Sequence, residues 1–148
     1  MFTRALLTAA SIAAAATLTT ALPAQAASPI QFGKIQYDSP GKDTTAGASV
    51  NGEYVVIKNT GKTSRSLTGW TVRDAAHHVY TFGTFTLGPG KSVVLRTGKG
   101  KNTSSTRYWG KGWHVWNNTG DKAYLRTKSG TTADYCAWTS NGTGHKYC

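Results

Sequence analysis

The sequence predicts an all-β fold, because short stretches in which apolar and polar residues alternate recur between turn-forming segments. Residues 53–58 (EYVVIK) alternate in this way, so that every second side chain from Tyr54 onward falls on one face. Residues 59–66 then supply Asn and Gly, which tolerate the positive φ angles of tight turns. A second strand is expected over residues 67–72, with a bulge or kink at Gly69.

The rest of the chain repeats this pattern of short strands and turn signals. The clearest turn is the Gly-Pro-Gly-Lys sequence at residues 88–91, which precedes an apolar run. In chain order, the further expectations are a strand at residues 30–37 with a break at Gly33 and Lys34, a loop at 38–51, a strand at 92–97, and a hairpin formed by 122–127 and 131–138.

Four ordered motifs give the chain a family resemblance. They are residues 53–61 (EYVVIKNTG), 67–74 (LTGWTVRD), 87–95 (LGPGKSVVL) and 116–125 (WNNTGDKAYL). In this order they resemble the lamin tail domain family, and the resemblance extends from about residue 30 to residue 138. The ordered set is specific, although no single motif is.

The resemblance implies an immunoglobulin-like β-sandwich, with a hairpin turn at residues 75–77 and a strand at 78–82. It also implies that Trp109 and Trp116 pack on the core. It implies no catalytic activity, and the fold alone assigns no biochemical role. In bacteria such domains are exported modules, which makes nucleic acid or an envelope polymer the favoured class of partner.

Residues 1–26 are interpreted as a signal peptide, which leaves residues 27–148 as one domain. Arg4 precedes an Ala- and Leu-rich apolar run, and an A-x-A pattern ends at Ala26, where cleavage is expected. The alternative is a retained membrane anchor; no other segment has the length and apolarity to span a membrane. The Ala-rich leader indicates a secreted bacterial protein, with association with the cell wall as a further expectation.

The chain contains two cysteines, Cys136 and Cys148. In an exported protein two cysteines are expected to form a disulfide. This bond would tie residues 140–148 back to the last strand of the predicted hairpin.

The charge of the chain points to a polyanionic partner. There are 17 Lys and Arg against 6 Asp and Glu, a formal net charge of +11. The candidate contacts are four basic residues that lie close together in predicted loops, Lys99, Lys101, Arg107 and Lys111. Their partner would be extracellular DNA or an acidic envelope polymer; the alternatives are a protein partner at the cell surface, or a charge that serves only solubility.

Residues 107–116 (RYWGKGWHVW) form the densest aromatic stretch. Its rings either pack on the core or form an exposed surface on which bases or sugars stack. Trp113 lies outside the residues that carry the resemblance, so we expect it to be partly exposed and to belong to the binding surface.

No motif in the sequence indicates an enzyme, a cofactor or a metal site. There is no nucleophile elbow, no H-E-x-x-H motif and no Gly-rich fingerprint between a strand and a helix. Asp38 and Asp43 are too few for a calcium site, and the adjacent His77 and His78 are expected to point to opposite faces of a strand. Two other carboxylates have structural roles in this interpretation: Asp121 orders a turn, and Asp134 pairs with a Lys or Arg across the sheet.

Overall fold

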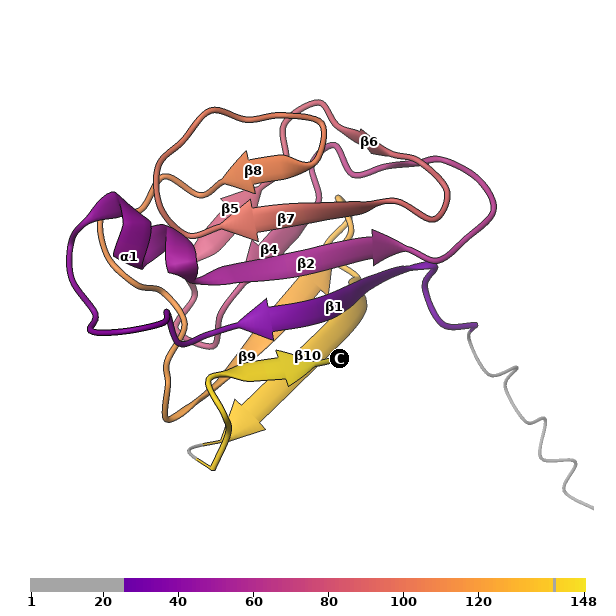
Figure 1. Cartoon of the computed structure of the whole chain (residues 1–148). Helices are drawn as coiled ribbons and strands as arrows, with labels where there is room; N and C mark the ends of the chain where they lie inside the picture. Colours follow the sequence, from indigo (N-terminus) through magenta and orange to yellow (C-terminus); the bar gives the residue numbers. More distant parts are fainter. Residues whose placement is uncertain (1–25, 140) are drawn as a thin grey trace, which may run out of the picture.

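The computed structural model describes residues 26–139 and 141–148, and these fold into two β-sheets packed face to face (Figure 1). The first sheet has the strand order β11-β1-β2-β7-β8 and the second β10-β9-β4-β5, while β3 and β6 pair separately. The immunoglobulin-like β-sandwich is therefore confirmed. The elements are β1 (Ile30–Gln36), α1 (Gly47–Gly52), β2 (Tyr54–Asn59), β3 (Arg65–Ser66), β4 (Thr71–Arg73), β5 (Val79–Thr81), β6 (Thr86–Leu87), β7 (Ser92–Arg96), β8 (Thr106–Tyr108), β9 (Gly120–Arg126), β10 (Thr132–Thr139) and β11 (His145–Tyr147).

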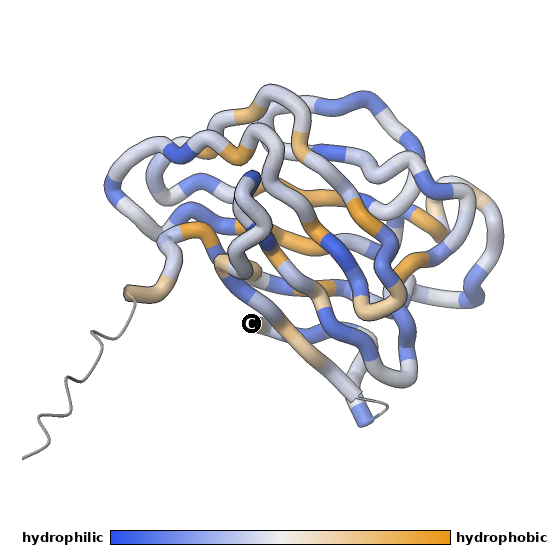
Figure 2. The backbone as a smooth tube through the Cα atoms, turned by 180° about the vertical axis from the view of Figure 1, so that it is seen from behind, coloured by the Kyte–Doolittle hydropathy of each residue, from blue (hydrophilic) through white to orange (hydrophobic). Residues whose placement is uncertain are grey.

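Alternation along the strands fills the space between the two sheets. In β2, Val55 and Ile57 are fully buried, and they face Leu95 and Val93 of β7 in the antiparallel register. Leu125 of β9 closes the core from the other sheet. Because side chains alternate between faces, the residues between these apolar positions must point outward. In Figure 2 the orange, apolar stretches of the backbone accordingly lie mostly in the strands.

The strand expected at residues 67–72 forms only in part, because residues 67–70 make a turn and Thr71 and Val72 belong to β4. Trp70 donates its backbone N–H to the carbonyl of Leu67 at 2.9 Å, and Gly69 between them has φ +78°. That tight turn separates β3 from β4, which belong to different sheets. Gly69 therefore marks a break, as expected, but the single continuous strand was wrong because Gly69 allows the chain to reverse.

Two further elements were not predicted. Residues 47–52, within the expected loop, form the short helix α1. Its Val50 side chain is buried, which holds the helix against the sandwich. Residues 145–147 form β11, an edge strand paired with β1. Both elements are short and owe their conformation to the surface they lie on, which a local sequence pattern does not contain.

The disulfide between Cys136 and Cys148 is confirmed, with the two Cα atoms 5.8 Å apart. Cys136 lies in β10 of the second sheet, and Cys148 follows β11 of the first. The bond therefore covalently joins the two sheets. The backbone N–H of Cys148 also donates to the carbonyl of Gly33 at 3.1 Å, which fixes the end of β11 against β1.

Asp134 also joins the two sheets, and its expected pairing with a basic residue was wrong. Its Oδ2 accepts the backbone N–H of Phe32 at 2.8 Å. The register of β1 against β2 shifts between Phe32 and Ile35, which confirms the predicted break at Gly33 and Lys34. β11 pairs only with residues 34–36 of β1, and the Asp134 carboxylate supplies an acceptor for the N–H of Phe32, beyond the end of that pairing.

The predicted signal peptide, residues 1–26, lies outside the described residues except for Ala26, and it stays a prediction. Within the part of the chain that the structure describes, no helix has the length and apolarity needed to cross a membrane.

Candidate functional site

Five of the six carboxylates gather at one end of the sandwich, which we call the carboxylate end and define by Asp38, Asp43, Glu53, Asp74 and Asp121. Asp43, Asp74 and Asp121 line one pocket of about 500 Å³. Asp38 accepts a hydrogen bond from the side-chain amide of Asn118, which lines the same pocket. Glu53 follows α1, at the left of the molecule in Figure 1.

Glu53 is the most deeply buried carboxylate of this end. Its two oxygens accept the backbone N–H groups of Val115 and Trp116, each at 2.9 Å. Burial raises the pKa of Glu53 to about 7, because removing a carboxylate from water outweighs the hydrogen bonds that favour its ionised form. Glu53 therefore fixes the segment that carries Trp116 against the end of β2.

Trp116 is the centre of an aromatic cluster. Its ring is buried and lies 5.8 Å from the rings of both Trp109 and Trp138, in edge-on arrangements. Trp109 is partly buried against the core. The expected packing of Trp109 and Trp116 is confirmed.

Asp121 orders its turn as expected. Its carboxylate accepts the backbone N–H groups of Asn117 at 3.0 Å and Lys122 at 2.8 Å. It also accepts the N–H of Ala75 at 3.1 Å, from the turn before β5. One carboxylate therefore joins two loops that are 46 residues apart in sequence.

The two adjacent histidines separate, although not because both lie in a strand. His77 occupies the turn with φ +69°, and its Nδ1 lies 2.7 Å from a guanidinium nitrogen of Arg73. His78 Nδ1 lies 2.6 Å from the buried Asp74 carboxylate, which also accepts the His78 backbone N–H. Within residues 26–139 and 141–148, no group of three or more His, Cys, Asp or Glu side chains is arranged to hold a metal ion.

Trp113 is 52% exposed, as expected, but it lies at the carboxylate end. It lines the acidic pocket with His114, and the two rings are 5.2 Å apart in an edge-on contact. His114 is nearly buried, and its Nε2 lies 3.5 Å from an oxygen of Asp43. Trp113 therefore shares one pocket with the carboxylates of Asp43, Asp74 and Asp121.

The predicted basic residues are only partly brought together. Lys99 and Lys101 are exposed on the loop that follows β7, while Lys111 is half-buried. The Lys111 backbone N–H donates to Thr97 at 3.0 Å, so it lies beside the start of that loop. The side-chain amide of Asn51 donates to the carbonyl of Lys99 at 2.9 Å, which ties the loop to α1.

Arg107 lies on the other face of β8. It is in register with the buried Leu95, so its side chain points toward the core side of the sheet. Its guanidinium is 4.4 Å from the centre of the Phe85 ring. Arg107 covers the edge of the core and is separated from the exposed lysines by the strand.

Sequence reasoning missed a surface on the outer face of the first sheet, which we call the platform. Pairing across four strands places Gln36, Tyr54, Arg96 and Tyr108 in one outward-facing row. Lys34 and Tyr147, a pair in the register of β1 and β11, lie beside this row. We define the platform by the side chains of Lys34, Tyr54, Arg96, Tyr108 and Tyr147. The outward face of residues 53–58 is visible in the sequence, but its neighbours come from strands far apart in the chain.

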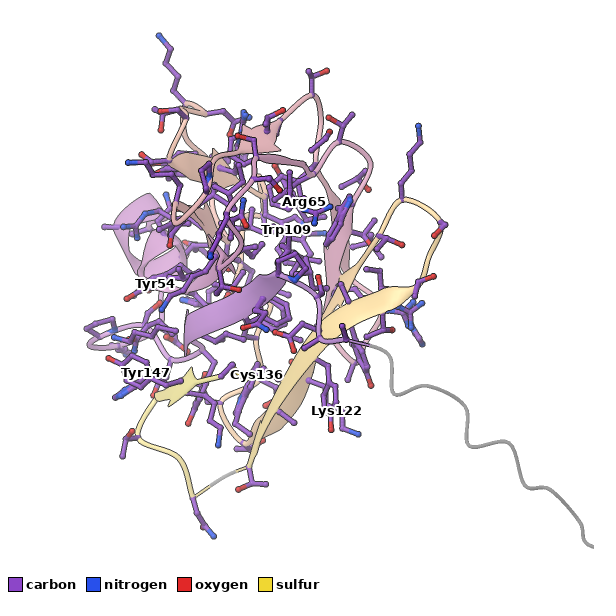
Figure 3. The ribbon with its side chains drawn as sticks, turned by 90° about the vertical axis from the view of Figure 1, so that its right-hand side faces the viewer. Tyr54, Arg65, Trp109, Lys122, Cys136 and Tyr147 are labelled. Atoms are coloured by element: carbon purple, nitrogen blue, oxygen red, sulfur yellow. A yellow bond between two sulfur atoms is a disulfide. The ribbon has the colours of Figure 1, made fainter. Side chains whose placement is uncertain are left out.

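Cations of the platform lie over its aromatic rings. The Lys34 ammonium is 5.8 Å from the centre of the Tyr54 ring and 6.0 Å from that of Tyr147. The Arg96 guanidinium is 5.4 Å from the Tyr54 ring. Figure 3 shows Tyr54 and Tyr147 on the same side of the sandwich, with Lys122 of the second sheet on the opposite side. None of the five strands of the first sheet contains an Asp or Glu.

The outer face of the second sheet has a related but smaller arrangement. The guanidinium groups of Arg73 and Arg126 lie 5.8 and 5.6 Å from the centre of the Tyr124 ring. Tyr135, which faces Tyr124 in the register, is 63% exposed. This face offers a matched comparison for the platform.

Comparison with known proteins agrees with this architecture. A family model described as Lamin Tail Domain matches residues 23–140. No match to the chain was found among curated proteins.

Proposed function

The chain belongs to the lamin tail domain family, and on that premise we propose that it is a secreted, non-catalytic module that binds a polyanion. The family is one of immunoglobulin-like binding and structural modules. A binding role needs no constellation of nucleophile, base and oxyanion donors. It needs an accessible surface of suitable charge, and such a surface is present.

The availability of the basic side chains carries this proposal. Among the described residues, no Lys or Arg forms an ion pair with a carboxylate within 4.0 Å; the acidic partners are taken by His78 and His114. Asp38, Glu53, Asp74, Asp121 and Asp134 instead accept hydrogen bonds from N–H groups. The positive charge is therefore not neutralised within the molecule and attracts polyanions.

The contact surface proposed for the polyanion combines Lys99, Lys101 and Lys111 with the neighbouring Arg96. Arg96 ends β7, and the loop with Lys99 and Lys101 follows directly. Arg107 and Trp113 were part of the sequence-based candidate site. Arg107 contributes long-range charge from the far side of β8, while Trp113, beside three carboxylates, is less suited to an anionic ligand.

Outside the cell the polyanions of suitable chemistry are extracellular DNA and the acidic polymers of the cell envelope. Both present repeating anionic groups along a flexible or semi-flexible chain. Binding to either releases condensed counterions, so the affinity falls as salt rises. The salt dependence thus reports on the number of phosphates that the protein contacts.

A salt series tests the proposal. Binding of the oxidised protein to duplex DNA, single-stranded DNA and a phosphate-containing wall polymer is measured between 50 and about 300 mM salt, a range over which phosphate contacts change affinity by orders of magnitude. The variant Lys99→Ala/Lys101→Ala/Lys111→Ala should reduce the slope of log affinity against log salt for duplex DNA by about 2 to 3.

The matched control removes three exposed lysines elsewhere, as Lys62→Ala/Lys122→Ala/Lys128→Ala. Both variants change the net charge equally, so a difference between them locates the contact surface. The proposal fails if none of the three polymers binds at low salt. If the control variant lowers the slope as much as the first variant does, the contact surface does not lie at Lys99, Lys101 and Lys111.

A protein partner is the alternative, and the second sheet offers the observation in its favour. Val79 of the edge strand β5 is 48% exposed, and it is in register with Arg73 on the outer face. A shallow hollow of about 530 Å³ at the β9–β10 end of this sheet includes Lys122 and Ala137. Binding there would be only weakly dependent on salt, which distinguishes it from a polyanion contact.

A further inference from the structure

We propose that the platform binds single-stranded nucleic acid, with a base stacked on Tyr147 and phosphates held by Lys34 and Arg96. This inference rests on the proposed polyanion binding and names the class of polymer. It also assigns the contact to a surface formed by five strands, to which the aromatic stretch of residues 107–116 contributes only Tyr108.

The exposed ring of Tyr147 provides the main stacking surface. Its side chain is 68% exposed, the largest exposed fraction among the large hydrophobic residues that are described. The Lys34 ammonium lies 6.0 Å from the ring centre, next to where the phosphate of a stacked nucleotide would lie. An aromatic ring beside a cation is the combination used by surfaces that bind single strands without sequence preference.

Tyr147 is held in place by bonds that its neighbour Cys148 makes to both sheets. Cys148 is bonded to Cys136 in the opposite sheet, and its N–H donates to Gly33 in β1. The ring of His145, two residues earlier on the same face, packs edge-on against Tyr147 at 5.4 Å. Ordering this residue therefore costs little when a ligand binds, which favours affinity.

Arg96 is also pre-positioned. One guanidinium nitrogen donates to the carbonyl of Asn51 at 2.6 Å, while the group lies 5.4 Å from the Tyr54 ring. The remaining guanidinium N–H groups are available to a phosphate. Because Arg96 is in register with Tyr54 and Tyr108, its charge lies midway along the row of the platform.

The arrangement favours a single strand over a duplex. Rings on a sheet face can stack only on bases whose own faces are free, and in a duplex each base is already stacked on its neighbours. Lys34 near one edge and the loop with Lys99 and Lys101 at the other provide cations at both ends of the row. A nucleic-acid strand that crosses the row would contact both Lys34 and the lysines of this loop.

The test compares strands with and without bases. The oxidised full chain is titrated with a fluorescent 20-residue deoxythymidine strand and with an abasic strand of the same length and charge, both at fixed salt. Tyr147→Ala should weaken binding to the thymidine strand about fivefold or more, as expected for loss of one stacked base. Binding to the abasic strand should not change.

Tyr135→Ala is the matched control. Tyr135 is 63% exposed and also precedes a disulfide cysteine, but it lies on the second sheet. This variant should leave both affinities unchanged. Tyr147→Phe keeps the ring and should bind as the parent does, which separates stacking from a hydroxyl contact.

A second measurement does not depend on a substitution. Photocrosslinking of a strand that contains 5-bromodeoxyuridine should modify the peptides that contain Tyr147 or Tyr54. Equal affinity for thymidine and abasic strands, or crosslinks confined to residues 109–116, would overturn the stacking proposal and leave polyanion binding intact. Absence of binding to either strand would overturn the proposed single-strand site, while duplex DNA and the wall polymer would still test polyanion binding separately.

Discussion

The carboxylate end and the platform use their charged side chains in opposite ways. At the carboxylate end, Glu53 and Asp121 together accept five backbone N–H groups from Val115, Trp116, Asn117, Lys122 and Ala75. On the platform, the charged groups of Lys34 and Arg96 lie beside a tyrosine ring, and neither forms an ion pair with a carboxylate. The carboxylates of Glu53 and Asp121 hold loops in place, whereas Lys34 and Arg96 have no carboxylate partner and can bind an anionic ligand.

This difference separates stability from binding. A carboxylate that satisfies buried donors contributes to folding, since an unpaired buried N–H costs free energy. A surface cation beside an aromatic ring contributes little to folding. Substitutions at the carboxylate end should therefore reduce stability without changing affinity, and substitutions on the platform should do the reverse.

The largest loss of stability is expected for Glu53→Ala. It leaves the N–H groups of Val115 and Trp116 without acceptors in a buried environment, at a cost of about 2 to 6 kcal/mol for the pair. Urea denaturation measures this change, and Glu53→Gln, which keeps one acceptor oxygen, should lose less. A loss below about 1 kcal/mol would show that these N–H groups find other partners.

Loss of the disulfide should come next. Reduction, or Cys136→Ser/Cys148→Ser, should lower the free energy of unfolding by about 3 kcal/mol in the chain-entropy account of a ring this size. Because β11 carries Tyr147, affinity for a thymidine strand should also fall in this variant. Thermal denaturation measures the stability and titration measures the affinity. If stability falls while affinity is unchanged, Tyr147 does not belong to the binding surface.

The pH dependence of stability should show the ionisation of Glu53. Its folded-state pKa of about 7 lies above the ordinary value of 4.5, so the folded protein holds the proton more tightly. Stability from this group is therefore full below pH 4.5, declines as pH rises toward 7 and is lost above it, by on the order of 3 kcal/mol in total. The difference in unfolding free energy between the parent and Glu53→Gln, measured from pH 4 to 9, isolates this contribution, and a difference that does not vary with pH would contradict it.

Asp121→Ala should have a smaller effect on stability, about 1 to 2 kcal/mol, because its three N–H partners belong to residues that are exposed to water. Asp121→Asn keeps one acceptor oxygen and serves as its control. Hydrogen exchange should become faster at Ala75 and Asn117 together, since one carboxylate holds both loops. Faster exchange at only one of them would show that the loops are held independently.

The smallest change in stability is expected for Lys34→Gln, within about 0.5 kcal/mol, as for most surface substitutions. Its affinity for single strands should nevertheless fall, with a salt slope reduced by about 0.7, the value for one phosphate contact. Lys122→Gln on the opposite sheet is the control and should leave this slope unchanged. If both variants behave alike, the platform has no special role in binding.

Local signals in the sequence determined several features correctly. Alternation in residues 53–58 and 92–97 identified β2 and β7, because burial on one face of a strand repeats every second residue. The two cysteines and the turn-ordering role of Asp121 also followed from short-range chemistry. Gly69 marked a break, but the direction in which the chain continues after it depends on the sheets to which β3 and β4 pair.

Only the tertiary structure decided which charged and aromatic side chains meet. Arg107 and Lys111 are close in sequence, yet register with Leu95 turns Arg107 toward the core. Lys34, Tyr54 and Tyr147 are far apart in the chain and become neighbours through the pairing of β1 with β2 and β11. A strand pattern specifies which face a side chain occupies, whereas its neighbours are set by register and strand order, which arise from packing of the whole core.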